Sequence, residues 1–194
     1  VPTALTDSAA LMRLRGQTAQ TDCLTLIIDP QQRMPARMKT AGDLINNLER
    51  LAHAVSRMGR PLLIAESYDM GDILPQLAKY TGETETVRHI HPDVWSAPDM
   101  ERFISAIDCR KVIIAGAATN VELLQTAPGF LKRGYETIIL EDCCDSADRP
   151  GHDHALEQLR DKGCRLSTLE TEVMQLAGGC SKQVLDAVKN ILFT

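Results

Sequence analysis

The sequence has few aromatic residues, no long apolar run and no excess of basic residues. Aromatic side chains make up 4% of the 194 residues, and tryptophan occurs once. No apolar stretch approaches the roughly 20 residues that a helix needs to cross a bilayer. The formal net charge is -5 at pH 7, which argues against the basic face that nucleic acids and anionic membranes require. We therefore expect neither a nucleic-acid partner nor a membrane partner.

The cysteines lack the spacing of a zinc site or of a disulfide framework. The chain has 6 cysteines without a Cys-x-x-Cys pair, and Cys143 and Cys144 are adjacent. Free, buried thiols in a reducing cytosol are the simplest explanation of this pattern. Residues 1–21 contain no apolar core of a secretory signal, and we expect them to form an arm that packs on the domain or on a partner subunit. The sequence thus predicts a cytoplasmic protein.

Length and composition fit one globular domain. Hydrophobic residues make up 44% and charged residues 24% of the chain, which is the usual composition of a folded protein. A chain of 194 residues is long enough for one sizeable core and too short for two comfortable ones. We find no internal repeat, low-complexity segment or linker. The predicted organisation is an N-terminal arm at residues 1–21 and a single domain at residues 22–194.

Strand-like and helix-like segments alternate along residues 22–194. The clearest strand is the apolar run Cys23–Ile28, and the clearest helix begins at Thr40 and has apolar residues at helical spacing up to Gly59. Such alternation is typical of a parallel sheet covered by helices on both faces. We therefore predict an α/β fold, a Rossmann-like three-layer αβα sandwich with a mainly parallel sheet of about six strands. The other predicted strands are residues 61–65, 86–90, 111–115, 137–140 and 165–168, and the other predicted helices are residues 73–80, 98–107, 119–133, 152–162, 170–176 and 182–191.

Polar side chains gather where the predicted strands end. Asp29 follows the first strand, His89 lies near the end of the third, and the stretch Gly116–Glu122 follows the fourth. In a parallel sheet of this kind, ligands bind outside the carboxyl ends of the strands. A lone carboxylate at the end of an apolar strand is costly unless it is paired or lies in a cleft, although Asp29 could instead cap a turn before Pro30. We therefore place the candidate site at this edge of the sheet.

The order and spacing of several stretches resemble the isochorismatase-like, or cysteine hydrolase, superfamily. Leu26 to Gln31 resembles the family's first strand, which ends in Asp-x-Gln, and Ile114 to Ala127 resembles its G-x-x-T-x-x-C…T-A stretch. Gly134 to Ser146 and Ser167 to Leu176 resemble later family segments, so that the likeness extends from Asp22 to Ile191. Members of the family hydrolyse small amides, carbamate-like compounds or, in isochorismatases proper, a vinyl ether.

The resemblance implies a catalytic set that this chain keeps only in part. Family members use an aspartate base, a lysine that stabilises charge, and a cysteine nucleophile at a helix N-terminus. The helix amides there lower the pKa of the thiol and can bind an oxyanion. The aspartate position is Asp29, the cysteine position is Glu122, and the lysine position falls on His89 or on its neighbour Arg88. The usual thioester chemistry is therefore not available.

The resemblance also suggests roles for the remaining residues. Asp29 would act as general base or acid, Glu122 as its partner and His89 as an electrostatic stabiliser, because two carboxylates in one cleft push one pKa upward. The resemblance implies no cofactor, and it implies a non-proline cis peptide bond within residues 117–119. The substrate, a small polar molecule, is expected to contact Gln31, Tyr68, Trp95, Gly116, Ala118 and Thr119, with Trp95 as a wall of the pocket.

Simpler interpretations compete with these roles. Thr119-x-x-Glu122 is also a capping box, in which the glutamate bonds only the start of its own helix. His89 could be an ordinary hydrogen-bonded histidine at a strand end. Asp29, Glu122 and His89, together with His91, are ligand types for a divalent ion, but their spacing is no metal motif and we expect no metal.

Two functions therefore stay open at the level of sequence. The first is a cofactor-free hydrolase of a small polar molecule that works without a cysteine nucleophile. The second is a catalytically inactive family member that binds a small ligand or serves as an assembly subunit, because two of the three catalytic positions are altered. Family members usually form dimers or larger assemblies, so the resemblance also implies a homo-oligomer.

Overall fold

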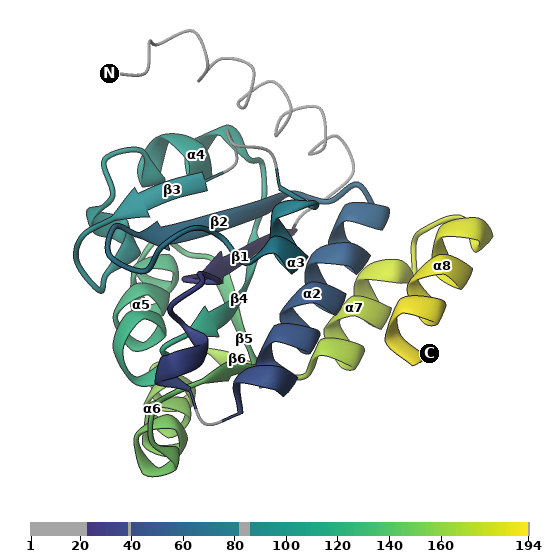
Figure 1. The fold of residues 1–194 in the computed structure, drawn as a ribbon. Helices are drawn as coiled ribbons and strands as arrows, with labels where there is room; N and C mark the ends of the chain where they lie inside the picture. Colours follow the sequence, from purple (N-terminus) through teal and green to yellow (C-terminus); the bar gives the residue numbers. More distant parts are fainter. Residues whose placement is uncertain (1–22, 39, 82–85, 194) are drawn as a thin grey trace, which may run out of the picture.

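The computed structural model describes residues 23–38, 40–81 and 86–193, so the arm predicted at residues 1–21 lies outside the described residues. The described strands form one parallel sheet in the order β3-β2-β1-β4-β5-β6 (Figure 1). Strands β1 and β4 are therefore central, and β3 and β6 form the edges. The strands are β1 (Cys23–Ile28), β2 (Leu62–Ser67), β3 (Thr86–His89), β4 (Lys111–Ala117), β5 (Glu136–Asp145) and β6 (Arg165–Ser167).

Helices cover both faces of the sheet. The α-helices are α2 (Ala41–Arg57), α3 (Pro75–Ala78), α4 (Met100–Ala106), α5 (Leu124–Lys132), α6 (Arg149–Asp161), α7 (Leu169–Ala177) and α8 (Lys182–Phe193). Two short 3-10 turns, η2 (Pro35–Arg37) and η3 (Val94–Ser96), and a π-helical turn, η4 (Thr119–Leu123), complete the described elements. Figure 1 shows α2, α7 and α8 on one face and α4, α5 and α6 on the other. This arrangement confirms the predicted three-layer α/β fold.

The central strands are apolar on both sides because both sides are covered. Every residue of β1 is buried. Leu24 and Leu26 belong to the core beneath α4, α5 and α6, whereas Cys23 and Ile27 belong to the core beneath α2, α7 and α8. Successive side chains of a strand point to opposite faces, and a parallel strand that is buried on both faces reads as a continuous apolar run.

The backbones of β1 and β4 approach each other closely at their carboxyl ends. Gly116 has φ +118°, and a Cβ atom at this position would lie 2.0 Å from the carbonyl oxygen of Ile28. Only glycine fits this position, both for space and for backbone conformation. Just beyond it, the Ala117–Ala118 peptide bond is cis, within the residues where the family resemblance places such a bond. The chain after β4 is thereby brought next to Asp29, which follows β1.

Two elements differ most from their predictions. Strand β5 continues to Asp145, and its register against β4 shifts between Ile114 and Gly116. The helix predicted at residues 119–133 begins with the π-helical turn η4 and continues as α5, with Pro128 inside it. In the described part of the chain, no helix has the length and apolar character needed to span a bilayer.

Candidate active site

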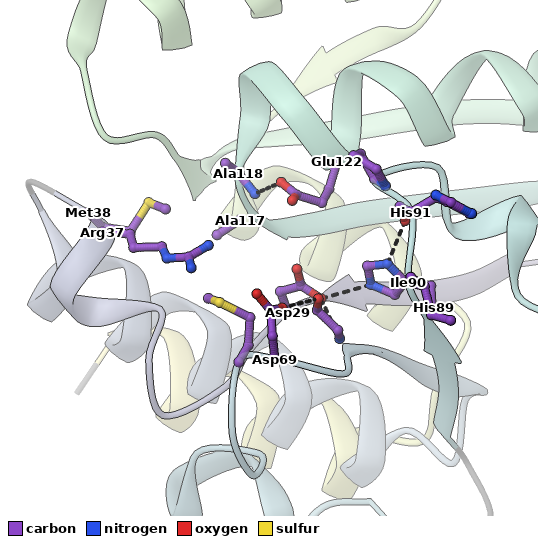
Figure 2. Close-up of a pocket in the computed structure, with 13 residues that line it drawn as sticks. Asp29, Arg37, Met38, Asp69, His89, Ile90, His91, Ala117, Ala118 and Glu122 are labelled. Carbon is purple, nitrogen blue, oxygen red and sulfur yellow. Dashed lines mark hydrogen bonds and ion pairs between the residues drawn. The ribbon is translucent and has the colours of Figure 1, made fainter.

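A cavity of about 190 Å³ opens at the carboxyl ends of the central strands (Figure 2). Asp29, His89 and Glu122 all line it, although Asp29 follows β1, His89 ends β3 and Glu122 lies in η4, which are far apart in the sequence. The aspartate and the glutamate therefore share one space, as the predicted site requires. The other lining residues are Arg37, Met38, Ser67, Asp69, Met70, Ile90, His91, Pro92, Ala117 and Ala118.

Asp29 is buried at the floor of the cavity and is held by two hydrogen-bond donors. Its side chain is 4% exposed, and its backbone has φ 51°, a conformation that is uncommon for residues other than glycine. The backbone N–H of Ser67 donates to Oδ1 over 3.0 Å, and Nε2 of His89 lies 2.9 Å from the same oxygen. The turn after β1 therefore aims the carboxylate into the cavity and fixes one of its oxygens.

His89 contacts an acceptor with each ring nitrogen. Nδ1 lies 2.8 Å from the carbonyl oxygen of His91, and because a carbonyl only accepts, Nδ1 carries a hydrogen. Nε2 then shares a single proton with the carboxyl group of Asp29. Burial lowers the pKa of His89, but the hydrogen bond to Asp29 and its negative charge outweigh burial, so the pKa is raised overall. The raised pKa favours the imidazolium form of His89 beside Asp29.

His89, and not Arg88, faces the cavity from β3. Arg88 points to the other side of the sheet edge, where its Nε donates to Glu66 over 3.0 Å. Adjacent residues of a strand alternate in direction, so only one of the pair can face Asp29. The cation beside the aspartate is thus a histidine, whose charge depends on pH.

Glu122 folds back onto the start of its own helix. Its Oε2 accepts a hydrogen bond of 2.7 Å from the backbone N–H of Ala118. In the predicted capping box, Glu122 would accept from the backbone N–H of Thr119. The first turn is instead π-helical with Ala118 as the capping residue, so Glu122 bonds the N–H one residue earlier. Glu122 thus caps its helix and also lines the cavity, and the capping and site interpretations both apply.

The environment of Glu122 favours its protonated form. Burial raises the pKa of Glu122, the Ala118 hydrogen bond opposes this rise, and the negative charge of Asp29 adds to it. The net direction is upward, as expected for two carboxyl groups in one cleft. Because Glu122 occupies the Ala118 N–H, the turn that the sequence assigns to an oxyanion does not present this donor to a ligand.

Several residues predicted to contact substrate instead support the site from behind. Ala118 lines the cavity, but Gln31, Gly116 and Thr119 do not. The Gln31 side chain accepts from Ser67 N–H over 2.8 Å and donates to Ser67 O over 2.9 Å. Thr119 is fully buried and faces Asp145 and His152 rather than the cavity. These residues hold the backbone that carries Asp29, His89 and Glu122.

Trp95, which the sequence predicts as a wall of the pocket, does not line the cavity. The indole packs against Phe130 and donates from Nε1 to Thr126 O over 3.1 Å. The guanidinium of Arg133 covers its other face at 3.7 Å from the ring centroid. The turn η3 directs the side chain toward α5, so Trp95 borders a separate surface depression. Tyr68 is 66% exposed and also lies outside the cavity lining.

Two charged lining residues are absent from the sequence prediction. Arg37 comes from η2, and Asp69 follows β2. Ser67 Oγ donates to Asp69 over 2.8 Å, and this bond, together with the positive charges of Arg37 and Arg33, lowers the pKa of Asp69. Neither residue lies in a strand or an α-helix, so hydrophobic periodicity carries no information about the direction of its side chain.

The described residues offer neither a thiol nor a metal-binding group at this cavity. None of the lining residues is a cysteine. Elsewhere, burial raises the pKa of the Cys143 thiol and of the Cys144 thiol well above the usual value of a cysteine. In residues 23–38, 40–81 and 86–193, no group of at least three His, Cys, Asp or Glu side chains has the arrangement of a metal site. The chemistry available from these side chains is proton transfer between carboxyl groups and an imidazole.

A search of protein families finds the isochorismatase domain over residues 23–171. The chain belongs to the isochorismatase-like family. Among curated relatives, isochorismatase domain-containing protein 2 of Xenopus laevis is 22% identical over 189 residues, which cover 93% of this chain and 88% of the relative. Isochorismatase domain-containing protein 1 of Danio rerio is 27% identical over 169 residues, which cover 84% of this chain and 58% of the relative.

Solved structures share the isochorismatase-like fold. The MAR1 ribonuclease of Caenorhabditis elegans superposes with a TM-score of 0.82 at 22% identity, covering 90% of this chain and 91% of that chain. The YcaC gene product of Escherichia coli, described as an octameric hydrolase of unknown specificity, superposes with a TM-score of 0.78 at 18% identity, covering 88% of this chain and 87% of that chain. At these identities the likeness establishes the fold.

Proposed function

We propose that this member of the isochorismatase-like family hydrolyses a small polar molecule by acid–base chemistry, with water in place of the cysteine nucleophile. The observation that carries the proposal is that Asp29, His89 and Glu122 line one cavity of about 190 Å³. A cavity of this kind suits a small molecule. Perturbed carboxyl and imidazole groups that meet in one cleft are the usual setting of acid–base catalysis.

Asp29 is the general base of this proposal. Both of its hydrogen bonds from described residues go to Oδ1, so Oδ2 is the oxygen that takes the proton of a water molecule. The hydrogen bond with His89 holds Asp29 in place before the reaction, and the imidazolium form of His89 stabilises negative charge near it during the reaction. His89 thereby takes part of the role that a lysine has in other family members.

Glu122 is the general acid. Its raised pKa favours the protonated form that a general acid needs, and its Oε2 accepts from the Ala118 N–H, which leaves Oε1 to donate. Water adds to the electrophilic carbon of the substrate, its proton passes to Asp29, and the Glu122 proton passes to the leaving atom as the bond to carbon breaks. Exchange with solvent then restores a protonated Glu122 and an ionised Asp29.

A catalytically inactive, ligand-binding member is the second candidate, and one contact favours it. The Ala118 N–H donates to Glu122, so a substrate oxyanion finds this donor already occupied. Stabilisation of an oxyanion by backbone donors is commonly a large part of acyl-transfer catalysis. A chain that has lost both the thiol and an accessible donor could retain binding without turnover.

RNA hydrolysis receives less support, although the Caenorhabditis elegans structural neighbour is named as a ribonuclease. The net charge of this chain is -5, whereas binding of a phosphate backbone requires clustered basic residues. Among the described residues that line the cavity, Arg37 is the single arginine and no lysine is present. We therefore retain a small-molecule substrate.

A hydrolase screen tests the proposal. Small amides, ureas, esters and vinyl ethers are incubated with the protein, and products are followed by NMR. We expect Glu122→Gln and Asp29→Asn to lower the rate by about 100-fold or more. The control is Glu157→Gln, which changes an exposed carboxyl group on α6. Turnover that survives in Glu122→Gln, or no turnover of any compound by the unaltered chain, would contradict a hydrolase and favour the inactive member.

We also propose that the chain forms a homo-oligomer, as the octameric Escherichia coli neighbour does. Exposed apolar side chains lie close to the mouth of the cavity, with Ile90 76% and Tyr68 66% exposed. Sedimentation velocity of the full chain tests this proposal, and a monomer at micromolar concentration would contradict it. A cytoplasmic location stays a prediction from the sequence.

A further inference from the structure

Arg37 contributes a positive charge that the acid–base chemistry does not use. It lines the cavity, and Figure 2 shows its guanidinium pointing toward the space between Ala117 and Asp29. His89 is positive when it is protonated, but its Nε2 is already paired with Asp29. Among the described residues, none forms a hydrogen bond or an ion pair with the Arg37 side chain, whose charge acts on Asp69 only at longer range. Arg37 is therefore the cation that can pair with a bound molecule.

The backbone that carries Arg37 is anchored on both sides. The Arg37 N–H donates to Met34 O over 2.9 Å, and Met34 is fully buried. Beyond η2, the backbone N–H and Oγ1 of Thr40 donate to Oδ2 of Asp145 over 3.0 and 2.7 Å. These contacts attach the segment to the core and to the end of β5. They hold the backbone of Arg37 beside the cavity that its side chain lines.

The charges around the cavity limit what Arg37 can bind. A guanidinium presents paired N–H donors that match the two oxygens of a carboxylate. The same cavity is lined by the carboxyl groups of Asp29, Asp69 and Glu122. An anion with two charges, such as phosphate, would leave one charge without a cation and close to these groups, which is unfavourable. One guanidinium among several carboxyl groups fits a monoanion.

We propose that Arg37 binds the carboxylate of the substrate, so that the substrate class is small monocarboxylates. That the bound molecule is a substrate rests on the proposed hydrolase function, whereas binding of a carboxylate to Arg37 requires no turnover. With its carboxylate on Arg37, a small molecule extends across the cavity toward Asp29 and Glu122, where its scissile bond lies. Arg37 then decides which molecules bind, and the carboxyl pair carries out the chemistry.

Binding of simple probes tests the carboxylate site. Propionate, its neutral isostere propionamide, and inorganic phosphate are titrated by NMR into the full chain up to about 100 mM. We expect propionate to bind at least about tenfold more tightly than either other probe, because a hydrogen-bonded charge pair is typically worth tenfold or more in affinity. Equal affinity for propionate and propionamide, a preference for phosphate, or no propionate binding in this range would overturn the proposal.

Matched variants assign the binding to Arg37. Arg37→Gln is expected to weaken propionate binding about tenfold or more, and Arg37→Lys to weaken it less, because lysine keeps the charge but loses the paired donors. Arg160→Gln, which changes an exposed arginine on α6, is expected to bind propionate as the unaltered chain does. Unchanged propionate binding in Arg37→Gln would overturn the assignment.

The carboxylate site and the hydrolase fail in different ways. Propionate binding that depends on Arg37, in a chain that hydrolyses none of the screened compounds, supports the site and contradicts the hydrolase. Hydrolysis of neutral compounds at a rate unchanged by Arg37→Gln supports the hydrolase and overturns the carboxylate site. Glu122→Gln is expected to bind propionate with no loss of affinity while turnover is lost, which separates the two roles in one protein.

Discussion

Two buried histidine–aspartate clusters lie at the carboxyl edge of the sheet, and they hold their protons differently. His89 and His152 are equally buried, each with 2% exposure. The pKa of His89 is raised although burial opposes it. The pKa of His152 is lowered, first by burial and then by the positive charge of Arg149. Equal exposure thus accompanies opposite shifts of the two histidine pKa values.

The difference lies in the atom that each ring nitrogen contacts. His89 contacts the carboxylate of Asp29 directly. His152 contacts the hydroxyl of Thr119, whose own proton goes to the backbone carbonyl of Asp145. The Asp145 carboxylate is already bonded by Thr40 and by the Ser146 N–H, and these bonds outweigh burial and lower its pKa. Both carboxylate oxygens of Asp145 accept hydrogen bonds that stabilise the fold. The hydrogen bonds to Asp29 go to Oδ1, which leaves Oδ2 for chemistry.

The largest expected effect separates Asp29 from Asp145. Asp29→Asn is expected to lower kcat/KM by about 10²–10⁴, because it removes a general base. Asp145→Asn is expected to keep kcat within a few-fold but to cost about 1–3 kcal/mol of stability, because Thr40 and Ser146 lose charge-assisted hydrogen bonds. Rates from the hydrolase screen and urea unfolding measure both. Equal losses of activity in the two variants would remove the distinction between the clusters.

An intermediate effect is an opposite pH dependence of stability. The folded-state pKa of His89 lies above 6.5, so its contribution is full below about pH 6.5 and is lost as pH rises through the folded-state pKa. The folded-state pKa of His152 lies below 6.5, so its contribution is full above about pH 6.5 and is lost as pH falls through the folded-state pKa.

Urea unfolding between about pH 5 and pH 9 tests these slopes. His89→Gln is expected to flatten the alkaline side of the stability curve, and His152→Gln the acidic side. Each slope is limited to about 1.4 kcal/mol per pH unit, since one proton is involved. If both substitutions flatten the same side, the contrast between the two rings is wrong.

The smallest expected effect concerns Glu122. Its raised folded-state pKa means that its contribution to stability is full below about pH 4.5 and is lost as pH rises through the folded-state pKa, when the buried carboxyl ionises. Glu122→Gln cannot ionise and can still accept the Ala118 N–H, so at pH 7 to 8 we expect it to be more stable by up to about 1 kcal/mol. Thermal unfolding measures this gain, and Glu157→Gln is expected to stay within about 0.5 kcal/mol. A less stable Glu122→Gln would argue against the raised pKa.

The fold could be predicted because buried strands have a simple sequence pattern. Strand β1 is predicted to the residue, since an apolar run bounded by polar residues allows no other element of that length. Strand β5 is predicted too short, because its second half, Glu141 to Asp145, is mostly polar and acidic and resembles a loop. That half is extended because it pairs with the last residues of β4 beyond the register shift, which is a tertiary effect.

The site could be predicted only where a strand end fixes the direction of a side chain. The positions of Asp29, His89 and Glu122 follow from this rule and from the family resemblance. Thr119 was expected at the ligand, but the π-helical turn rotates it toward His152. The family spacing gives the position of Trp95 in the sequence but not the direction in which its side chain points. Nothing in the sequence indicates that the segment at Arg37 returns to the cavity.

The most direct test of the acid–base site is the protonation state of the His89 ring. Nitrogen NMR of the imidazole groups near pH 7, assigned with His89→Gln and His152→Gln, reports which ring nitrogens carry hydrogen. We expect both nitrogens of His89 to be protonated and only one nitrogen of His152, and we expect Asp29→Asn to shift the His89 titration to lower pH. A neutral His89 ring near pH 7, or a titration unaffected by Asp29→Asn, would contradict an ion pair at the centre of the cavity.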